Sequence, residues 1–251
     1  MEEAHQQSAV VFLPQSELFS REEVEGALGD IEGAVLTWHE EYELEDTKAL
    51  SLHLEGQHLA ISFLKAPLVP ALYHDLLDAS GLEDDDRQQI EAHGSHVRVI
   101  SMKTGEIVEP ADRIWLVYRA AVRLAGLGQG AVLAPLSGVF VMGVDPSYVD
   151  SRREENVPPM DLWVQVELGQ DGVARSRGAG IGGIPEVELS GIAELEPDQI
   201  YSSVMDTLVF LRQIRRFLVA QETVHIGRQP WQWEVTEGEE TLVKLNRIPL
   251  T

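Results

Sequence analysis

Hydrophobic side chains recur at every second position in several short stretches of the first half of the chain. Residues 9–13 form a continuous apolar run that is typical of a buried strand, and residues 34–38 form another. In residues 49–55 and 59–63, Leu, Ile or Phe alternates with smaller or polar residues, and Gly56 lies between the two runs. Two alternating runs around a glycine turn predict a β-hairpin within an antiparallel sheet. The alternation also predicts that one face of this sheet is exposed to water or covered by polar groups.

Helical spacing of apolar residues appears on both sides of these strands. Ser20 and Glu23 form a capping-box pattern, which predicts a helix over about residues 21–29. Residues 110–125 carry an apolar stripe of helical period, and Gly126 and Gly128 are expected to end that helix. A further helix is expected from Pro197 to about residue 221.

The remaining patterns complete an α+β prediction. Further strands are expected at residues 96–102, 131–142 and 162–168, and at residues 186–189. We predict an antiparallel or mixed β-sheet that is covered on one face by the helices at about 111–125 and 197–221. The chain is expected to form a single domain, 1–251, with two closely packed halves at 9–145 and 158–251. Residues 145–159, which contain three prolines, are predicted to be the connecting loop between them.

The charge of the chain narrows the classes of partner. Its 251 residues include 42 acidic and 19 basic side chains, which gives a formal net charge of −23. Such a chain repels phosphate backbones and anionic lipids, so neither nucleic acid nor membrane is an expected partner. Two interpretations stay open: a solvated acidic surface that favours solubility, or a face that binds a protein with a basic surface.

The sequence shows neither cysteine nor a recognisable targeting signal. The sequence contains no cysteine, which leaves no disulfide, thiol nucleophile or Cys-ligated metal. No apolar run approaches the roughly 20 residues that span a bilayer. The first residues also lack the basic and apolar regions of a signal peptide, so a cytoplasmic location is expected.

A glycine-rich segment stands out at residues 178–183. Gly178, Gly180 and Gly183 satisfy the spacing G-x-G-x-x-G of dinucleotide sites. The preceding residues 173–177 are polar, and Pro185 and a predicted strand follow, so no helix N-terminus is expected to hold a pyrophosphate. We therefore interpret these glycines as residues that let the backbone bend.

Two small groups of side chains could carry chemistry. His93 and His96 lie three residues apart before a predicted strand, a spacing that could chelate a metal; otherwise each ring caps backbone groups. Glu186 and Glu188 point to the same face of a predicted strand as a candidate carboxylate pair; otherwise they lie on a solvent-facing strand edge. The sequence holds no nucleophile elbow or P-loop, and the stretch from His39 to Glu43 lacks the second histidine of H-E-x-x-H.

The same residues carry a family resemblance. The stretch Ala-His-Gly-Ser-His-Val-Arg-Val at 92–99, the run 130–140 and above all Arg-Gly-Ala-Gly-Ile-Gly-Gly-Ile-Pro-Glu-Val-Glu-Leu at 177–189 resemble the bacterial family called domain of unknown function 4261. The similarity covers roughly residues 9 to 220, although Ile181 and Gly182 replace the family's usual apolar and aromatic pair. The resemblance implies an α+β bacterial cytoplasmic protein and brings no activity.

The sequence thus favours a non-enzymatic, protein-binding accessory or immunity-type module whose acidic first half binds a basic partner. We expect no cofactor, metal ligand or catalytic residue under this interpretation. The candidate binding residues are His93, His96, Glu186, Glu188, Gly180 and Gly183. One alternative is a metal-dependent hydrolase that uses His93 and His96 with Glu186 and Glu188. Another is a homo-oligomeric structural protein.

Overall fold

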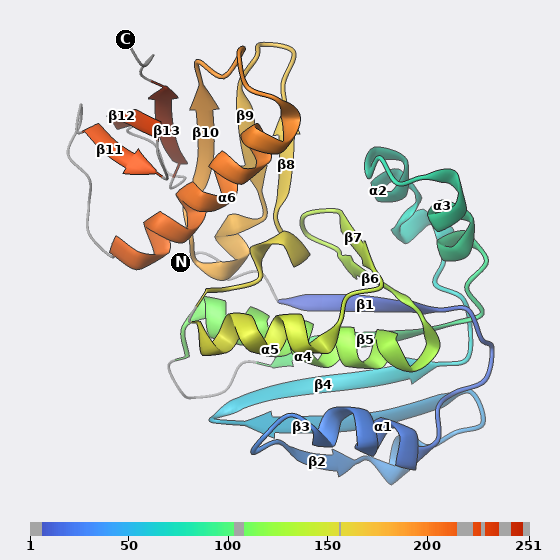
Figure 1. Cartoon of the computed structure of the whole chain (residues 1–251). Helices are drawn as coiled ribbons and strands as arrows, with labels where there is room; N and C mark the ends of the chain where they lie inside the picture. Colours follow the sequence, from blue (N-terminus) through green and yellow to red (C-terminus); the bar gives the residue numbers. More distant parts are fainter. Residues whose placement is uncertain are drawn as a thin grey trace. The chain divides into compact units, whose positions relative to one another are not determined.

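The chain has an α+β fold, as predicted, and divides into two compact units (Figure 1). This computed structural model describes residues 7–102, 108–155, 157–214, 223–226, 229–235 and 242–247. Unit 1 is Met1–Leu162 and unit 2 is Trp163–Thr251. The division falls just after the segment that separates the two predicted halves.

Unit 1 is built on a seven-stranded antiparallel sheet in the order β2-β3-β4-β5-β1-β6-β7. Its strands are β1 (Ser8–Leu13), β2 (Val35–Trp38), β3 (Thr47–Leu54), β4 (Gln57–Leu64), β5 (Ser95–Met102), β6 (Ala131–Ala134) and β7 (Val139–Met142). The predicted hairpin is β3–β4. It turns at Glu55 and Gly56, which both have positive φ, 48° and 77°. Positive φ at both central residues is what a two-residue hairpin turn of type I′ requires.

One face of this sheet is covered by helices α1 (Arg21–Gly29) and α4 (Pro110–Gly128), and α5 (Pro146–Glu154) packs against α4 (Figure 1). Ser20 caps α1 with both hydrogen bonds of the predicted capping box. Helix α4 packs against β1, β5 and β6, and most of its length is buried. Gly126 does not end α4, which continues to Gly128, where Gln129 adopts the left-handed conformation.

The opposite face of the sheet is only partly covered. The short helices η2 (Pro70–Leu72), α2 (His74–Ala79) and α3 (Asp84–Glu91) place Tyr73, Leu77 and Ile90 against side chains of β1, β6 and β7. Phe12 of β1 is central to this cluster, with its ring edge-on to Tyr73 at a centroid distance of 5.1 Å. No residue of β2, β3, β4 or β5 belongs to this cluster.

Unit 2 contains a six-stranded mixed sheet in the order β11-β12-β13-β10-β9-β8. Its elements are β8 (Gln165–Leu168), β9 (Ala174–Arg177), η4 (Ala179–Gly182), β10 (Glu186–Ser190), α6 (Pro197–Ile214), β11 (Thr223–Ile226), β12 (Gln229–Val235) and β13 (Leu242–Arg247). The pairing of β10 with β13 is parallel. Helix α6 covers the sheet with Ile200, Val204 and Leu208, three residues of the predicted stripe (Figure 1). The predicted continuation of the helix to residue 221 lies outside the described residues.

Three predictions about this architecture were wrong. The strands form two sheets instead of the single sheet that was predicted. The two predicted covering helices therefore lie on different sheets. The predicted connecting loop at 145–159 contains α5, because Asp145 caps the helix and Pro146 occupies its first turn, where proline is well tolerated. The predicted strand at 162–168 is strand only from Gln165, since Leu162 closes the short helix η3 (Met160–Leu162).

Candidate functional site

His93 is a buried structural histidine. Its Nε2 accepts a hydrogen bond from the main-chain nitrogen of Leu68 at 2.7 Å, and its Nδ1 lies 2.6 Å from the carbonyl oxygen of Ile90. This pairing requires the neutral ring with the proton on Nδ1. Burial lowers the pKa of His93, which favours that neutral form. Because both nitrogens are used, neither offers a lone pair to a metal in this arrangement.

His96 has a similar role on β5. Its Nδ1 lies 2.7 Å from the carbonyl oxygen of Ala66, and burial lowers the pKa of the ring. Its Nε2 is buried with no hydrogen-bond partner among the described residues. The interpretation that each ring caps backbone groups is therefore confirmed for both histidines. No group of three or more His, Asp or Glu side chains in the described part of the chain could hold a metal ion.

Glu186 binds the glycine-rich segment that precedes it. Its Oε1 accepts hydrogen bonds from the main-chain nitrogens of Gly178 at 2.9 Å and Gly180 at 3.1 Å. Its Oε2 accepts one from the Ser176 hydroxyl at 2.6 Å, and that hydroxyl in turn accepts one from the nitrogen of Val187 at 2.8 Å. Backbone nitrogens that could have held an external anion are thus occupied by the protein's own carboxylate.

The two candidate glycines, Gly180 and Gly183, shape this loop. Gly183 has a φ of 71° at the end of η4, a conformation that favours glycine, and Gly180 supplies one of the nitrogens that Glu186 binds. Contrary to the sequence interpretation, a strand does precede the segment, since the polar residues 174–177 form β9. The short 3-10 helix η4 begins inside the segment at Ala179, and β10 follows it, so the expectation that no helix starts there was also wrong. The nitrogens of Gly178 and Gly180 at the start of η4 donate to Glu186.

Glu188 belongs to a row of ion pairs across unit 2's sheet. Arg175 of β9 donates to it at 3.0 Å, and Lys244 of β13 lies at 3.1 Å on the other side. Partial burial acts to raise the pKa of Glu188, but the hydrogen bonds from Lys244 and Arg175 outweigh it and the pKa is lowered. β10 lies between β9 and β13, so the predicted strand edge was wrong, although Val187 and Leu189 are buried on the opposite face as expected.

The sequence reasoning missed a buried charge cluster on α4. Arg119 and Arg123 are both nearly buried and share Asp150 of α5. The Nε of Arg119 donates to Asp150 at 2.8 Å, and a terminal nitrogen of Arg123 donates to the other carboxylate oxygen. The sequence spacing could have indicated that these two arginines share one face of α4, because residues 119 and 123 are one helical turn apart. Their contact with Asp150 joins α4 to α5.

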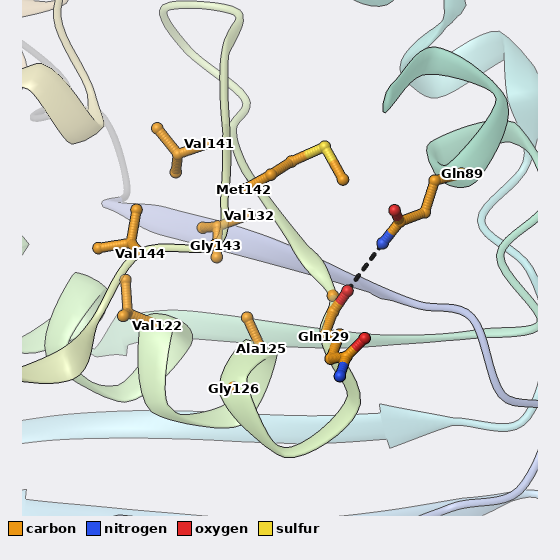
Figure 2. Close-up of a pocket in the computed structure, with 11 residues that line it drawn as sticks. Gln89, Val122, Ala125, Gly126, Gln129, Val132, Val141, Met142, Gly143 and Val144 are labelled. Atoms are coloured by element: carbon orange, nitrogen blue, oxygen red, sulfur yellow. Dashed lines mark hydrogen bonds between the residues drawn. The ribbon is translucent and has the colours of Figure 1, made fainter. Parts of the chain in front are cut away.

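Unit 1 also contains a groove of about 420 Å³ between the end of α4 and the β6–β7 hairpin (Figure 2). No charged side chain lines it. The lining is Gln89, Val122, Ala125, Gly126, Gln129, Gly130, Val132, Val141, Met142, Gly143 and Val144. At one end the amide of Gln89 points to the carbonyl oxygen of Gln129 and donates to it at 2.8 Å (Figure 2). These are neutral groups, so the groove holds no acid, base or nucleophile for chemistry.

The acidic side chains are unevenly divided between the two units. Unit 1 carries 29 acidic and 11 basic residues, and unit 2 carries 13 and 8. One concentration is the acidic turn, residues 40–46, which contains five carboxylates and is exposed throughout. Tyr42 and Leu44 within it are 58% and 67% exposed. The turn thus combines five carboxylates with two exposed large side chains, of which Tyr is a residue type enriched at protein interfaces.

A second concentration lies on the acidic helices, residues 74–91 of α2 and α3. This segment has seven acidic residues and one base, Arg87, which pairs with Asp78 and Glu91. Asp75, Glu83, Asp84, Asp85 and Asp86 have no ion-pair partner among the described residues. Val69 and Leu72, just before α2, are 60% and 57% exposed. The two acidic segments therefore repeat the same combination of carboxylates and exposed apolar groups.

Comparison of the chain with models of known protein families, with curated proteins and with solved structures finds no match. The similarity to the domain of unknown function 4261 stays a prediction. No helix within the described ranges is long and apolar enough to cross a membrane.

Proposed function

We propose that the chain is a non-enzymatic, acidic protein-binding module of the accessory or immunity type, which acts in the cytoplasm. Its unit 1 binds a protein partner with a basic surface. The observation that carries this proposal is the exposed acidic surface of unit 1, where exposed Tyr42, Leu44, Val69 and Leu72 lie among the carboxylates of the acidic turn and the acidic helices. In the turn, Arg21 pairs with Glu40 and Glu43, and His39 lies next to Glu41.

The candidate catalytic groups support a binding role over an enzymatic one. Both nitrogens of His93 and the carboxylate of Glu186 are used by main-chain groups, and Glu188 is held between two cations. No observation favours the metal-dependent hydrolase alternative. A basic partner would be attracted over a distance of about one Debye length, roughly 8 to 10 Å at moderate salt. Such attraction speeds association and weakens as salt increases.

The test is affinity capture from a native lysate with two variants of equal net charge. One variant neutralises the acidic turn with Glu41→Gln, Glu45→Gln and Asp46→Asn. The matched control neutralises three exposed carboxylates of unit 2 with Glu196→Gln, Asp198→Asn and Asp206→Asn. We expect the original chain and the control to capture the same basic protein at about 50 mM salt and to release it at about 300 mM.

The acidic-turn variant is expected to lose most of that capture. Binding must then be reproduced with the purified partner by titration, since capture alone does not establish a direct contact. Equal recovery by the acidic-turn variant, or a captured protein without a basic surface, would contradict the proposed function.

A further inference from the structure

The uncovered part of unit 1's sheet carries three rows of side chains that cross its strands. We call these residues the open face: Val35, His53, His58 and Met102; Thr37, Ser51, Ala60 and Ile100; Ala49, Ser62 and Arg98. Each row follows the register of β2, β3, β4 and β5, so its members are direct cross-strand neighbours, which lie close together on one side of a sheet.

The first row is accessible at both ends. Val35 is 60% exposed and Met102 is 43% exposed. Between them the rings of His53 and His58 contact each other with their centroids 3.6 Å apart. The other two rows consist mainly of Ala, Ser and Thr, and one of these residues, Ser51, is buried where its hydroxyl lies 2.7 Å from Nε2 of His39.

The open face lacks carboxylates although the chain has 42 of them. Of its eleven residues, only Arg98 is charged at neutral pH. Unit 2 gives an internal comparison, because the polar face of its sheet carries the cross-strand ion pairs of Arg175, Glu188 and Lys244. The polar sheet face of unit 2 thus carries charges of both signs, whereas the open face carries the single charge of Arg98, and depletion of charged residues is typical of an interface centre.

Acidic segments border the open face on two sides. The acidic turn connects β2 to β3, and its Leu44 pairs with Thr47 at the start of β3, two residues before Ala49. On the other side, Val10 of β1 is the register partner of Arg98 and packs against the cluster formed by the acidic helices. The result is a centre whose one charged side chain is Arg98, bordered by two acidic segments.

The size of the open face indicates how a partner must contact it. Four strands about 4.8 Å apart and three rows about 7 Å apart cover roughly 400 Å² once side chains are included. A stable complex buries about 800 Å² on each partner. A partner that docks on the open face must therefore extend over the acidic border as well.

We propose that the open face is the contact surface for a protein whose own surface has an apolar, uncharged centre surrounded by Lys and Arg. This inference rests on the proposed function and locates its binding surface. A second copy of the chain fits less well, because it would bring two acidic borders together in molecules that each carry a net charge of −23.

The test places a carboxylate on the open face with Ala60→Glu. This substitution makes the protein more acidic, so it would strengthen any attraction that depended on charge alone. Docking on the open face predicts the opposite, because the new carboxylate must be desolvated against an apolar surface. The matched control is Ser202→Glu on an exposed position of α6, which adds the same charge to unit 2.

The probes are two synthetic peptides, an amphipathic helix of Leu and Lys and a polylysine of equal charge. We expect Ala60→Glu to weaken binding of the Leu and Lys helix about tenfold, which corresponds to about 1.4 kcal/mol. We expect polylysine to bind Ala60→Glu at least as tightly as the original chain. Ser202→Glu should leave the affinity for the Leu and Lys helix unchanged or slightly higher. Circular dichroism of Ala60→Glu checks that the sheet is folded, and Ser62→Glu on the third row serves as a second variant.

Equal or tighter binding of the Leu and Lys helix by both Ala60→Glu and Ser62→Glu would overturn the open face as the contact surface. If the acidic-turn variant still lost binding, the proposed function would survive that result. Failure of both peptides to bind the original chain at low salt would overturn the proposed function and the inference together. A dimer in solution that Ala60→Glu dissociates would also overturn the inference, because the occupant would be a second copy.

Discussion

The main-chain nitrogen of Gly178 donates a hydrogen bond to the carboxylate of Glu186 at 2.9 Å. The bond joins residues eight positions apart and holds the glycine-rich loop against β10. Gly178 has a φ of 103°, a conformation that residues other than glycine rarely adopt. The loop's resemblance to a nucleotide-binding motif thus has an internal explanation, because the anion it holds is part of the chain.

Glu186→Ala should destabilise unit 2. It removes the acceptor of Gly178, Gly180 and Ser176, and a lost hydrogen bond to a charged group costs about 1.5 to 3 kcal/mol. Glu186→Gln should cost less, since its amide oxygen can still accept from the two nitrogens. Urea unfolding measures the difference, with Glu167→Ala as the control because the ion pair of Glu167 among the described residues is an exposed one, with Arg177 at 3.6 Å. Equal stability of the Glu186→Ala and Glu167→Ala proteins would contradict the role of Glu186.

Asp150→Asn should be among the most destabilising single substitutions in unit 1. It leaves Arg119 and Arg123 nearly buried without their shared carboxylate, and breaking a buried pair in this way costs about 3 kcal/mol. Asp78→Asn provides the contrast, because its pair with Arg87 is exposed and should contribute almost nothing. Thermal unfolding of the two variants tests this, and similar midpoints would show that the buried cluster does not hold α4 to α5.

Replacing each of two glycines near the end of α4 with alanine should change the free energy of unfolding in opposite directions. A Cβ at Gly126 meets nothing within 4 Å, so Gly126→Ala should stabilise the helix by about 0.5 to 1 kcal/mol. A Cβ at Gly130 would lie 2.3 Å from the carbonyl oxygen of Phe12, so Gly130→Ala should destabilise unit 1 by more than about 1 kcal/mol. The midpoint of urea unfolding should move up for the first variant and down for the second. A shift of the same sign in both would refute the steric argument.

Three histidines should make the protein less stable in mild acid. Burial lowers the pKa of His93 and His96, and burial together with the neighbouring His53 and His39 lowers that of His58. The folded state therefore binds fewer protons than the unfolded chain, whose histidines titrate near 6.5. The stabilisation is complete above about pH 6.5 and is lost as the pH falls through the folded pKa values. Protonation of His93 would also remove the acceptor for the nitrogen of Leu68.

Free energies of unfolding at about pH 7.5 and about pH 5.5 measure this loss, which occurs above the range in which carboxylates titrate. His58→Gln is the informative variant, because His58 is only half-buried and its replacement should leave the sheet intact. It should show a smaller loss between the two pH values than the original chain. An unchanged loss would mean that His58 does not contribute to the acid sensitivity.

Local elements could be predicted from the sequence because their causes lie within a few residues. The capping box of Ser20 and Glu23, the β3–β4 hairpin, and the alternation of Glu186, Val187, Glu188 and Leu189 all appear as expected. The acidic character of unit 1 likewise followed from counting charges. Helix α5 was an exception, since the prolines of residues 145–159 were interpreted as loop residues although Pro146 occupies the first turn of the helix.

The sequence by itself determined the α+β class, the main helices and hairpin, and the excess of negative charge, because spacing, capping and composition act locally. Only the tertiary structure decided that the strands form two sheets, that His93 accepts from Leu68, and that Glu186 occupies the glycine-rich loop. It also decided which sheet face stays uncovered, since that depends on where α2 and α3 pack. These contacts join residues that the fold brings together, and no short-range pattern specifies them.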